Sequence, residues 1–243
     1  PSLVGSEMCI RDRFKDFTGR SINEINLYST EMSSALCSID RVSASANMNN
    51  RLSEAIVEAY KSTNGTPISF ELMLKCYQSR MKDANNDDSI SSVLKQLVNA
   101  HIFESEDKVS LIDDSYIIKM DGYPKDGPIA KAIVYFLMSK LNNIYELLDK
   151  QAVNDEVVQI RHFSIIDEAH YMLDFDNRPL RNLIAVGRNK GLSIILATQN
   201  MSSFKSKGFD FYANAQYPLI MKQQTIDDKV INCLLYTSPS PRD

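Results

Sequence analysis

Residues His162–Leu173 read HFSIIDEAHYML, and this stretch decides the fold. Phe163–Ile166 form an apolar run that is typical of a buried β-strand, and the run ends in two adjacent carboxylates, Asp167 and Glu168. Ligands bind at the carboxyl ends of strands in parallel sheets, so this acidic pair suits nucleotide hydrolysis. Asp167 would hold the water shell of Mg²⁺, and Glu168 would orient and deprotonate the attacking water. The alternative is an ordinary strand that ends in two solvated acids.

A second apolar strand is predicted downstream, where residues 187–200 read GRNKGLSIILATQN. This strand covers Ser193–Thr198 and ends in Thr198 and Gln199. Beside the first strand, Gln199 would sense the γ-phosphate or the attacking water, and Thr198 is a candidate nucleotide-binding residue. Arg188 ends the preceding helix, from which a guanidinium could reach phosphate oxygens in its own subunit or a neighbouring one. The alternative for Arg188 is a helix C-terminal cation, which the helix dipole favours.

The rest of the chain is helical upstream and alternates strands with helices downstream. Helices are predicted at Asn49–Tyr60, after the capping residue Ser69, at Ser89–Ala100, from Pro128 onward and at Pro179–Asn189, with further strands at Val109–Ile112, Tyr116–Met120 and Tyr217–Met221. Residues 14–40 are polar and mixed, and they give no clear period. The alternation predicts the α/β class, with a parallel sheet that carries helices on both faces and an α-helical section before it.

The composition of the 243-residue chain, with 44% hydrophobic and 24% charged residues, is ordinary for a globular protein. No run of apolar residues is long enough for a transmembrane helix. The net charge of -4 argues against a basic nucleic-acid-binding protein, so any contact with nucleic acid must be local.

The two ends of the chain do not fit the segments that they adjoin. Residues 1–13 read PSLVGSEMCIRDR and residues 233–243 read CLLYTSPSPRD. Both resemble translated sequencing adapter, so we leave them out of the fold and expect a fragment of a longer reading frame; the alternative is a pair of disordered termini. Cys37 and Cys76 then remain without a C-x-x-C motif. This reduced pattern predicts a cytoplasmic protein without disulfides or a zinc site.

Together, IIDEAH at Ile165–His170 and GRNKGLSIILATQ at Gly187–Gln199 resemble the FtsK/HerA superfamily of P-loop ATPases. The resemblance implies a partial RecA-like core at 108–232 after an α-helical section at 14–107. It also implies ATP and Mg²⁺ as cofactors, DNA as the partner and a ring oligomer, most often a hexamer. By family role, Asp167 and Glu168 form Walker B, Gln199 couples hydrolysis to motion, and Arg188 acts on a neighbouring subunit's nucleotide. The nearest type is the HerA-like ATPases of bacterial defence, such as the DptH type, which would work with a nuclease or other defence subunits.

The chain departs from the family at the phosphate-binding loop, because it contains no G-x-x-x-x-G-K-[ST]. Gly122 and Gly127 have the right spacing, but Pro128 and Ile129 stand where Lys and Ser or Thr are needed. Proline also removes an N–H from a phosphate cradle. We therefore interpret residues 122–128 as a plain strand–helix turn, place the P-loop upstream of Phe14, and expect this fragment alone to lack ATPase activity.

Three other functions fit the same residues. Asp167–His170 spell D-E-A-H, the motif of a helicase superfamily in which the histidine couples ATP hydrolysis to nucleic acid; His170 is equally suited to a structural role. Such a helicase motor would have a second RecA-like domain downstream. A degenerate ATPase that serves as a non-catalytic scaffold, and a secretion-type motor that moves protein, are the other two.

Overall fold

The computed structural model of the chain describes residues 2–4, 14–39, 44–83, 86–100, 111–120, 122–154, 157–199, 205–206, 209–215, 217 and 219. The chain forms two compact units. The first comprises Pro1–Asp149 and Phe175–Leu180, and the second comprises Lys150–Asp174 and Arg181–Asp243. The boundary predicted between residues 107 and 108 lies outside the described residues. No helix in the described part of the chain is both long enough and apolar enough to cross a membrane.

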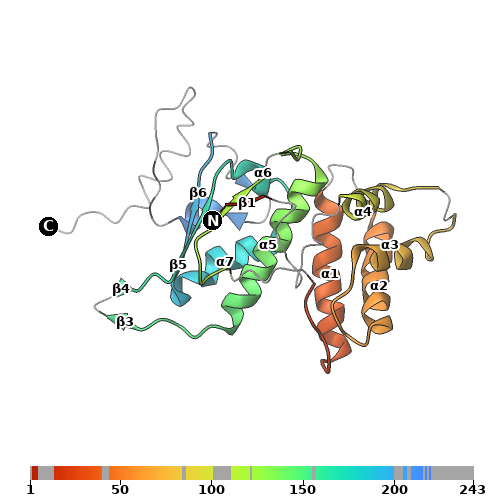
Figure 1. The fold of residues 1–243 in the computed structure, drawn as a ribbon, viewed down its shortest axis with the longest axis horizontal. Coiled ribbons are helices and arrows are strands. Elements are labelled where there is room, and N and C mark those ends of the chain that lie inside the picture. Colours follow the sequence, from red (N-terminus) through yellow and green to blue (C-terminus); the bar gives the residue numbers. More distant parts are fainter. Residues whose placement is uncertain are drawn as a thin grey trace. The chain divides into compact units, whose positions relative to one another are not determined.

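The first unit is built mainly of helices (Figure 1). Its elements are β1 (Ser2–Val4), α1 (Ile22–Ile39), α2 (Ala46–Ser62), α3 (Phe70–Gln78), α4 (Ser89–Asn99), β2 (Ile117–Lys119) and α5 (Pro128–Leu147). Successive helices from α1 to α5 pack against one another, and α1 also contacts α5. The backbone of β1, within the adapter-like end, pairs in parallel with β2.

The helix starts in this unit follow the capping chemistry of the sequence. Ser69 accepts a hydrogen bond from the backbone N–H of Leu72 and begins α3, as predicted. Asp88 begins α4 in the same way and forms a capping box with Ser91. Pro128 is at the first position of α5, where its missing N–H costs nothing. The predicted helices of this section are therefore confirmed.

Helix α1 was not predicted, because residues 14–40 show no clear apolar period. Its buried side includes Ile25, Met32 and Leu36, but also Ser29 and Ser33. The Ser29 hydroxyl donates to the carbonyl of Ile25 over 2.7 Å, so the buried oxygen has a partner within its own helix. Polar residues thus occupy core positions of α1 at little cost, and they hide the helical pattern.

One aromatic cluster joins the segment before α1 to the later helices. The ring of Phe14 meets Phe70 of α3 and Phe136 of α5 edge-on, with centroids 5.1 Å and 5.3 Å apart. Phe70 and Phe136 also contact each other at 5.4 Å. All three rings are at most 3% exposed, so they form the centre of the first unit's core. Burial of such large rings stabilises this unit.

The second unit holds a small parallel sheet. Its elements are β3 (Val153–Asn154), β4 (Val157–Val158), β5 (His162–Ile166), α6 (His170–Leu173), most of α7 (Arg178–Val186), the 3-10 helix η1 (Gly187–Lys190), β6 (Leu192–Leu196), β7 (Lys205–Ser206), β8 (Phe209–Asp210) and α8 (Phe211–Asn214). Strands β5 and β6 are parallel over their full length, from His162 opposite Leu192 to Ile166 opposite Leu196. The predicted α/β class is therefore confirmed.

One face of this sheet differs from the prediction of a buried run at Phe163–Ile166. Phe163 is 57% exposed and Ile165 is 70% exposed, while Ile195, opposite Ile165, is 46% exposed. The prediction of burial is wrong for this face. Successive side chains of a strand point to opposite faces of the sheet. A continuous apolar run is therefore buried throughout only where other elements cover both faces, and the face of Phe163 and Ile165 is not covered.

Two other strand predictions are not met by the described residues. Leu111 and Ile112, the described part of Val109–Ile112, lie in a turn. Tyr217 and Leu219, the described part of Tyr217–Met221, belong to no strand. The predicted strand at Tyr116–Met120 is confirmed as β2 and the one at Ser193–Thr198 as β6, each shorter than expected.

Candidate functional site

The tips of β5 and β6 are joined beyond their last paired residues. The N–H of Ala197 donates to the carbonyl of Ile166 over 2.9 Å, and the N–H of Ala169 donates to the carbonyl of Ala197 over 2.8 Å. These two bonds tie the turn after β5 to the residues after β6. The segment Asp167–His170 is thereby brought beside Thr198 and Gln199, at the carboxyl ends of both strands.

Asp167 is exposed at this edge of the sheet. Its Oδ1 accepts a hydrogen bond from the backbone N–H of Glu168 over 2.9 Å, which fixes the orientation of the carboxylate. A single oriented carboxylate suits Mg²⁺, because that ion keeps several waters and binds through one or two protein carboxylates. No cluster of three or more His, Cys, Asp or Glu side chains that could hold a metal directly occurs in the described part of the chain.

Glu168 has a backbone conformation that side chains other than glycine seldom adopt. Its φ is 52°, in the left-handed region. Such conformations persist only where the surroundings enforce them, and they are concentrated at functional sites. No sequence signal announces this feature, because glutamate carries no preference for a positive φ.

Both carboxylate oxygens of Glu168 lie close to a nitrogen of another side chain. Gln199 donates from Nε2 to Oε1 over 2.7 Å, and Nδ1 of His170 lies 3.3 Å from Oε2. The side chains of Glu168 and His170 are 28% and 26% exposed, so this carboxylate is only partly solvated. The two contacts come from different elements, the tip of β6 and the first turn of α6. The structure thus joins two predicted site residues, Glu168 and Gln199, directly.

Thr198 belongs to the same cluster through His170. Its Oγ1 lies 3.4 Å from Nδ1 of the imidazole, the ring nitrogen that also faces Glu168. We name Asp167, Glu168, His170, Thr198 and Gln199 the strand-tip cluster. All five were singled out from the sequence, but the contact between His170 and Thr198 was not foreseen, since 28 residues separate them.

Arg188 is not part of the strand-tip cluster. It lies in η1, which leads into β6 through Gly191, so it stands at the amino ends of the strands. The cluster stands at their carboxyl ends. Strand β6 has 5 residues, a length of about 17 Å, which exceeds the reach of an arginine side chain. Of the two roles predicted for Arg188, action within its own subunit does not fit this geometry.

The turn between β2 and α5 does not form a phosphate cradle. Gly122 has a φ of 93°, and the N–H of Gly127 is used by the carbonyl of Pro124 over 2.9 Å. Pro128, which follows, has no N–H to offer. Backbone N–H groups that point at the ligand are what such a cradle requires. The geometry agrees with the predicted plain strand–helix turn, and these residues form no phosphate loop.

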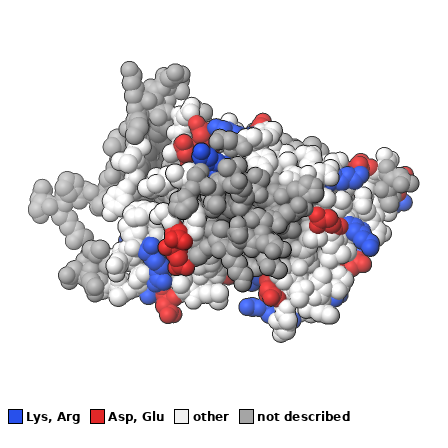
Figure 2. All heavy atoms as spheres, viewed as in Figure 1, with Lys and Arg blue, Asp and Glu red and all other residues white. Residues whose placement is uncertain are grey.

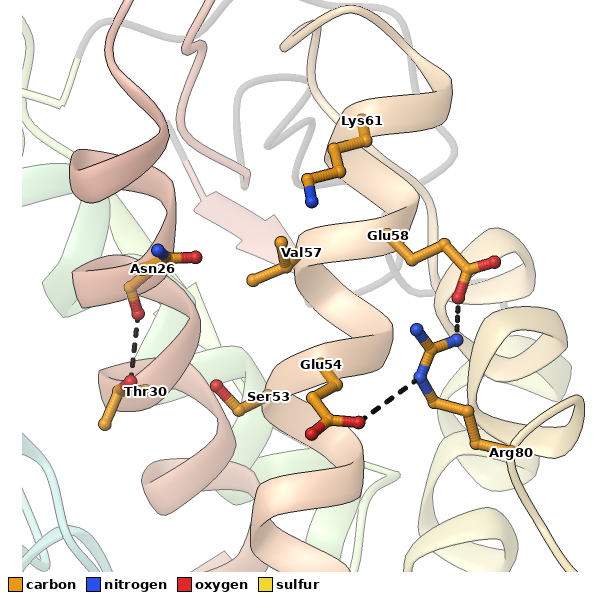
Figure 3. A pocket seen from close by; sticks show the side chains of 8 residues that line it. All are labelled: Asn26, Thr30, Ser53, Glu54, Val57, Glu58, Lys61 and Arg80. Carbon is orange, nitrogen blue, oxygen red and sulfur yellow. Dashed lines mark hydrogen bonds and ion pairs between the residues drawn. The ribbon is translucent and has the colours of Figure 1, made fainter.

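A groove of about 540 Å³ in the first unit is a second candidate. Figure 3 shows its lining from α1, α2 and Arg80: Asn26, Thr30, Ser53, Glu54, Val57, Glu58, Lys61 and Arg80. Arg80 forms ion pairs with Glu58 and, over 3.7 Å, with Glu54. Both carboxylates of the lining are thus paired with the Arg80 guanidinium, which weakens either of them as a general base, and the lining contains no histidine or cysteine. The strand-tip cluster is the stronger candidate for catalysis.

The comparisons with known proteins come from structure rather than sequence. No protein-family model matches the chain, and no curated protein matches it. Among solved structures, the chain is similar to VirB4 of Thermoanaerobacter pseudethanolicus, with a TM-score of 0.66 and 16% sequence identity; the similarity covers 98% of this chain and 68% of that one. At this identity the likeness concerns the fold alone. The chain therefore shares the fold of VirB4, in agreement with a partial RecA-like core.

Proposed function

We propose that this chain is part of an ATP-hydrolysing motor of the FtsK/HerA type, with the strand-tip cluster as its hydrolytic half. One observation carries the proposal: Glu168, at the tip of β5, is hydrogen-bonded over 2.7 Å to Gln199 at the tip of β6. A carboxylate beside a polar amide at the carboxyl edge of a parallel sheet is the arrangement that water-mediated phosphoryl transfer needs. The ATPase fold shared with VirB4 supports it.

Each residue of the cluster has a chemical task in this proposal. Asp167 binds waters of a Mg²⁺ ion, which would neutralise phosphate charge when present. Glu168 accepts the proton of the attacking water at a carboxylate oxygen. Gln199 orients that water from the neighbouring strand, and Thr198 binds nearby phosphate oxygen through its hydroxyl. The phosphate loop belongs to sequence upstream of Phe14, so the chain by itself is expected to be inactive.

Arg188 completes the site of a neighbouring subunit in this proposal. Its place at the amino ends of the strands, opposite its own cluster, supports action on a nucleotide bound to another copy. A ring oligomer, a hexamer by family resemblance, brings such surfaces together.

The cargo that we propose is DNA, in a DNA translocase or helicase-like motor of bacterial defence that works with a nuclease or other defence subunits. On the face shown in Figure 2, Lys and Arg side chains are interspersed with Asp and Glu. DNA contact would therefore be local, as the net charge of -4 also suggests.

The likeness to VirB4 favours a second candidate, the secretion-type motor that moves protein. The helicase motor and the non-catalytic scaffold are weaker alternatives. Gln199, bonded to Glu168, supports the FtsK/HerA type over the D-E-A-H helicase, and it supports a hydrolytic site over a scaffold. DNA-stimulated ATP hydrolysis separates the DNA motor from the protein motor.

The test begins with the intact gene from adapter-free long reads, translated upstream of Phe14. A G-x-x-x-x-G-K-[ST] motif after a strand is the expected finding. In the intact protein, Glu168→Gln should then lower kcat by roughly 10²-fold or more while ATP binding persists. Glu146→Gln, at an exposed carboxylate in α5, is the control and should hydrolyse ATP normally. A complete native start without a P-loop, or unchanged hydrolysis in Glu168→Gln, would overturn the proposal.

A further inference from the structure

We propose that His170 is a positioning residue, whose Nδ1–H holds one oxygen of Glu168 so that the other can meet the attacking water. The inference rests on the proposed function, in which Glu168 is the base. It adds a role that the D-E-A-H motif alone does not give, because His170 acts here on the glutamate and not on nucleic acid.

The two oxygens of Glu168 have different partners on different elements. Oε1 faces Gln199 on the β6 side at 2.7 Å, and Oε2 faces His170 at 3.3 Å. Loss of either contact leaves the other oxygen restrained. A shift of the β6 tip would therefore expose Oε1 to water while His170 still holds Oε2 in place.

His170 is itself fixed where it begins α6. The N–H of Tyr171 donates to the carbonyl of Glu168 over 3.1 Å, so the backbone turn is closed around the glutamate. The imidazole lies against the ring of Tyr171, with centroids 4.1 Å apart. Since the backbone of Glu168 is in the strained left-handed region, a partner that fixes its side chain also helps to keep this conformation.

The chemistry of the contact defines the protonation of the ring. A carboxylate only accepts hydrogen bonds, so the contact at 3.3 Å is favourable only when Nδ1 carries the proton. The Thr198 hydroxyl, 3.4 Å from the same nitrogen, can accept a share of that hydrogen. The inference therefore requires neutral His170 to be the Nδ1–H tautomer, whereas a Thr198 hydroxyl that donates to Nδ1 would require the Nε2–H tautomer.

The experiment that tests this needs no nucleotide. Long-range ¹H–¹⁵N spectra of the chain with ¹⁵N-labelled histidine, recorded in alkaline buffer where imidazole is neutral, distinguish the two tautomers. The chain has 3 histidines, so His170→Asn assigns the signal. We expect the Nδ1–H tautomer in the wild type and in Gln199→Ala, which leaves Oε2 untouched. Glu168→Ala should shift the ring toward Nε2–H. An Nε2–H ring in the wild type, or no change in Glu168→Ala, overturns the inference.

A second measurement compares the kcat of the intact protein with asparagine or glutamine in place of His170. The side-chain N–H₂ of asparagine takes the place of Nδ1, whereas that of glutamine takes the place of Nε2. His170→Ala and His170→Gln should lower kcat on the order of tenfold or more with KM unchanged, and His170→Asn should restore most of it. If His170→Asn and His170→Gln lose kcat equally while their backbone amide spectra remain native, a positioning role is contradicted. If the tautomer result holds but ATP is not hydrolysed, the contact between His170 and Glu168 stands and the proposed function fails. If ATP is hydrolysed with the wrong tautomer, only this inference fails.

Discussion

Gln199 and Glu168 are 31 residues apart in sequence, yet the amide of Gln199 donates to the carboxylate of Glu168 over 2.7 Å. The bond links the tips of two parallel strands, and it does so at a residue with a φ of 52°. A movement of either strand would therefore displace the Glu168 carboxylate or break this hydrogen bond. Coupling between hydrolysis and motion in the proposed motor would pass through this bond.

The left-handed conformation of Glu168 makes an unusual prediction for stability. Glycine in place of glutamate removes the steric cost of a positive φ, whereas alanine keeps it. We expect Glu168→Gly to be more stable than Glu168→Ala by about 1 kcal/mol, the reverse of the usual order. Hydrogen exchange of the β5 and β6 amides measures the difference. The pair Asn182→Gly and Asn182→Ala in α7 serves as control and should show the ordinary order.

The position of Arg188 predicts complementation between subunits. Arg188→Ala and Glu168→Gln variants of the intact protein should each lose ATP hydrolysis. A mixture of the two should regain part of it, because some interfaces then combine an intact Glu168 with an intact Arg188 from another copy. Steady-state ATPase assays across mixing ratios check this. Activity that only averages the two parents would place the action of Arg188 within one subunit.

His162 gives the second unit a dependence on pH. Burial lowers its pKa from 6.5, so the folded state disfavours the charged ring. The unfolded chain then binds more protons below about pH 6.5, and stability falls as pH drops through that value. Hydrogen exchange of the β5 amides from neutral to mildly acidic pH measures the loss, which His162→Gln should remove. The carboxyl groups of Asp16, Glu24 and Asp87 also have lowered pKa values, but their contributions are lost only below their usual values of 3.8 and 4.5.

Asp88 predicts a graded effect in the helical section. Its Oδ1 caps α4 through the N–H of Ser91 at 2.9 Å, and its Oδ2 accepts from the Tyr77 hydroxyl at 2.7 Å and from Arg51 at 3.3 Å. Burial, with help from this carboxylate, raises the pKa of Tyr77 and keeps the hydroxyl a donor. Asp88→Ala should lower the free energy of unfolding by about 1–3 kcal/mol. Asp88→Asn keeps the cap but has only one side-chain oxygen. Its free energy of unfolding, measured by urea denaturation, should therefore lie between those of the wild type and Asp88→Ala.

Gly122 and Gly191 both have a positive φ, and together they distinguish the cost of backbone strain from the cost of steric crowding when glycine is replaced by alanine. A Cβ at Gly191 would lie 2.7 Å from the carbonyl oxygen of Gln159, while one at Gly122 would meet nothing within 4 Å. Gly122→Ala should cost about 1–2 kcal/mol from the backbone conformation alone. Gly191→Ala should cost more, because the chain that leads into β5 must shift. Thermal unfolding followed by circular dichroism compares them, and equal losses would contradict the crowding.

The strand-tip cluster was predictable because its chemistry is local in the sequence. An apolar run followed by two acids, and a second run followed by an amide, indicate two neighbouring strands with polar tips. The contacts between the tips depend on register, with Ile166 opposite Leu196, and the sequence does not specify that register. The left-handed Glu168 was equally hidden, because the constraint comes from the surrounding bonds.

Helix α1 shows why the fold was only partly predictable. Five of its positions are serine or threonine, Ser29, Thr30, Ser33, Ser34 and Ser38, which have weak helix propensity. Four of the five hydroxyls donate to carbonyls within the helix, as Ser38 does to Ala35 over 2.8 Å, and that of Ser34 donates to the Asp176 carboxylate. Tertiary packing overrides local preference here, and no single-sequence pattern carries that information.

The exposed apolar face of β5 and β6 has a consequence for handling the chain in solution. Phe163 and Ile165 form a hydrophobic stripe, and a net charge of -4 gives little repulsion between copies. Expressed alone, the chain should self-associate through this stripe as its concentration rises, and sedimentation velocity would show the shift. Phe163→Lys should keep the chain dispersed without touching the strand tips, which makes it the better starting material for spectroscopy.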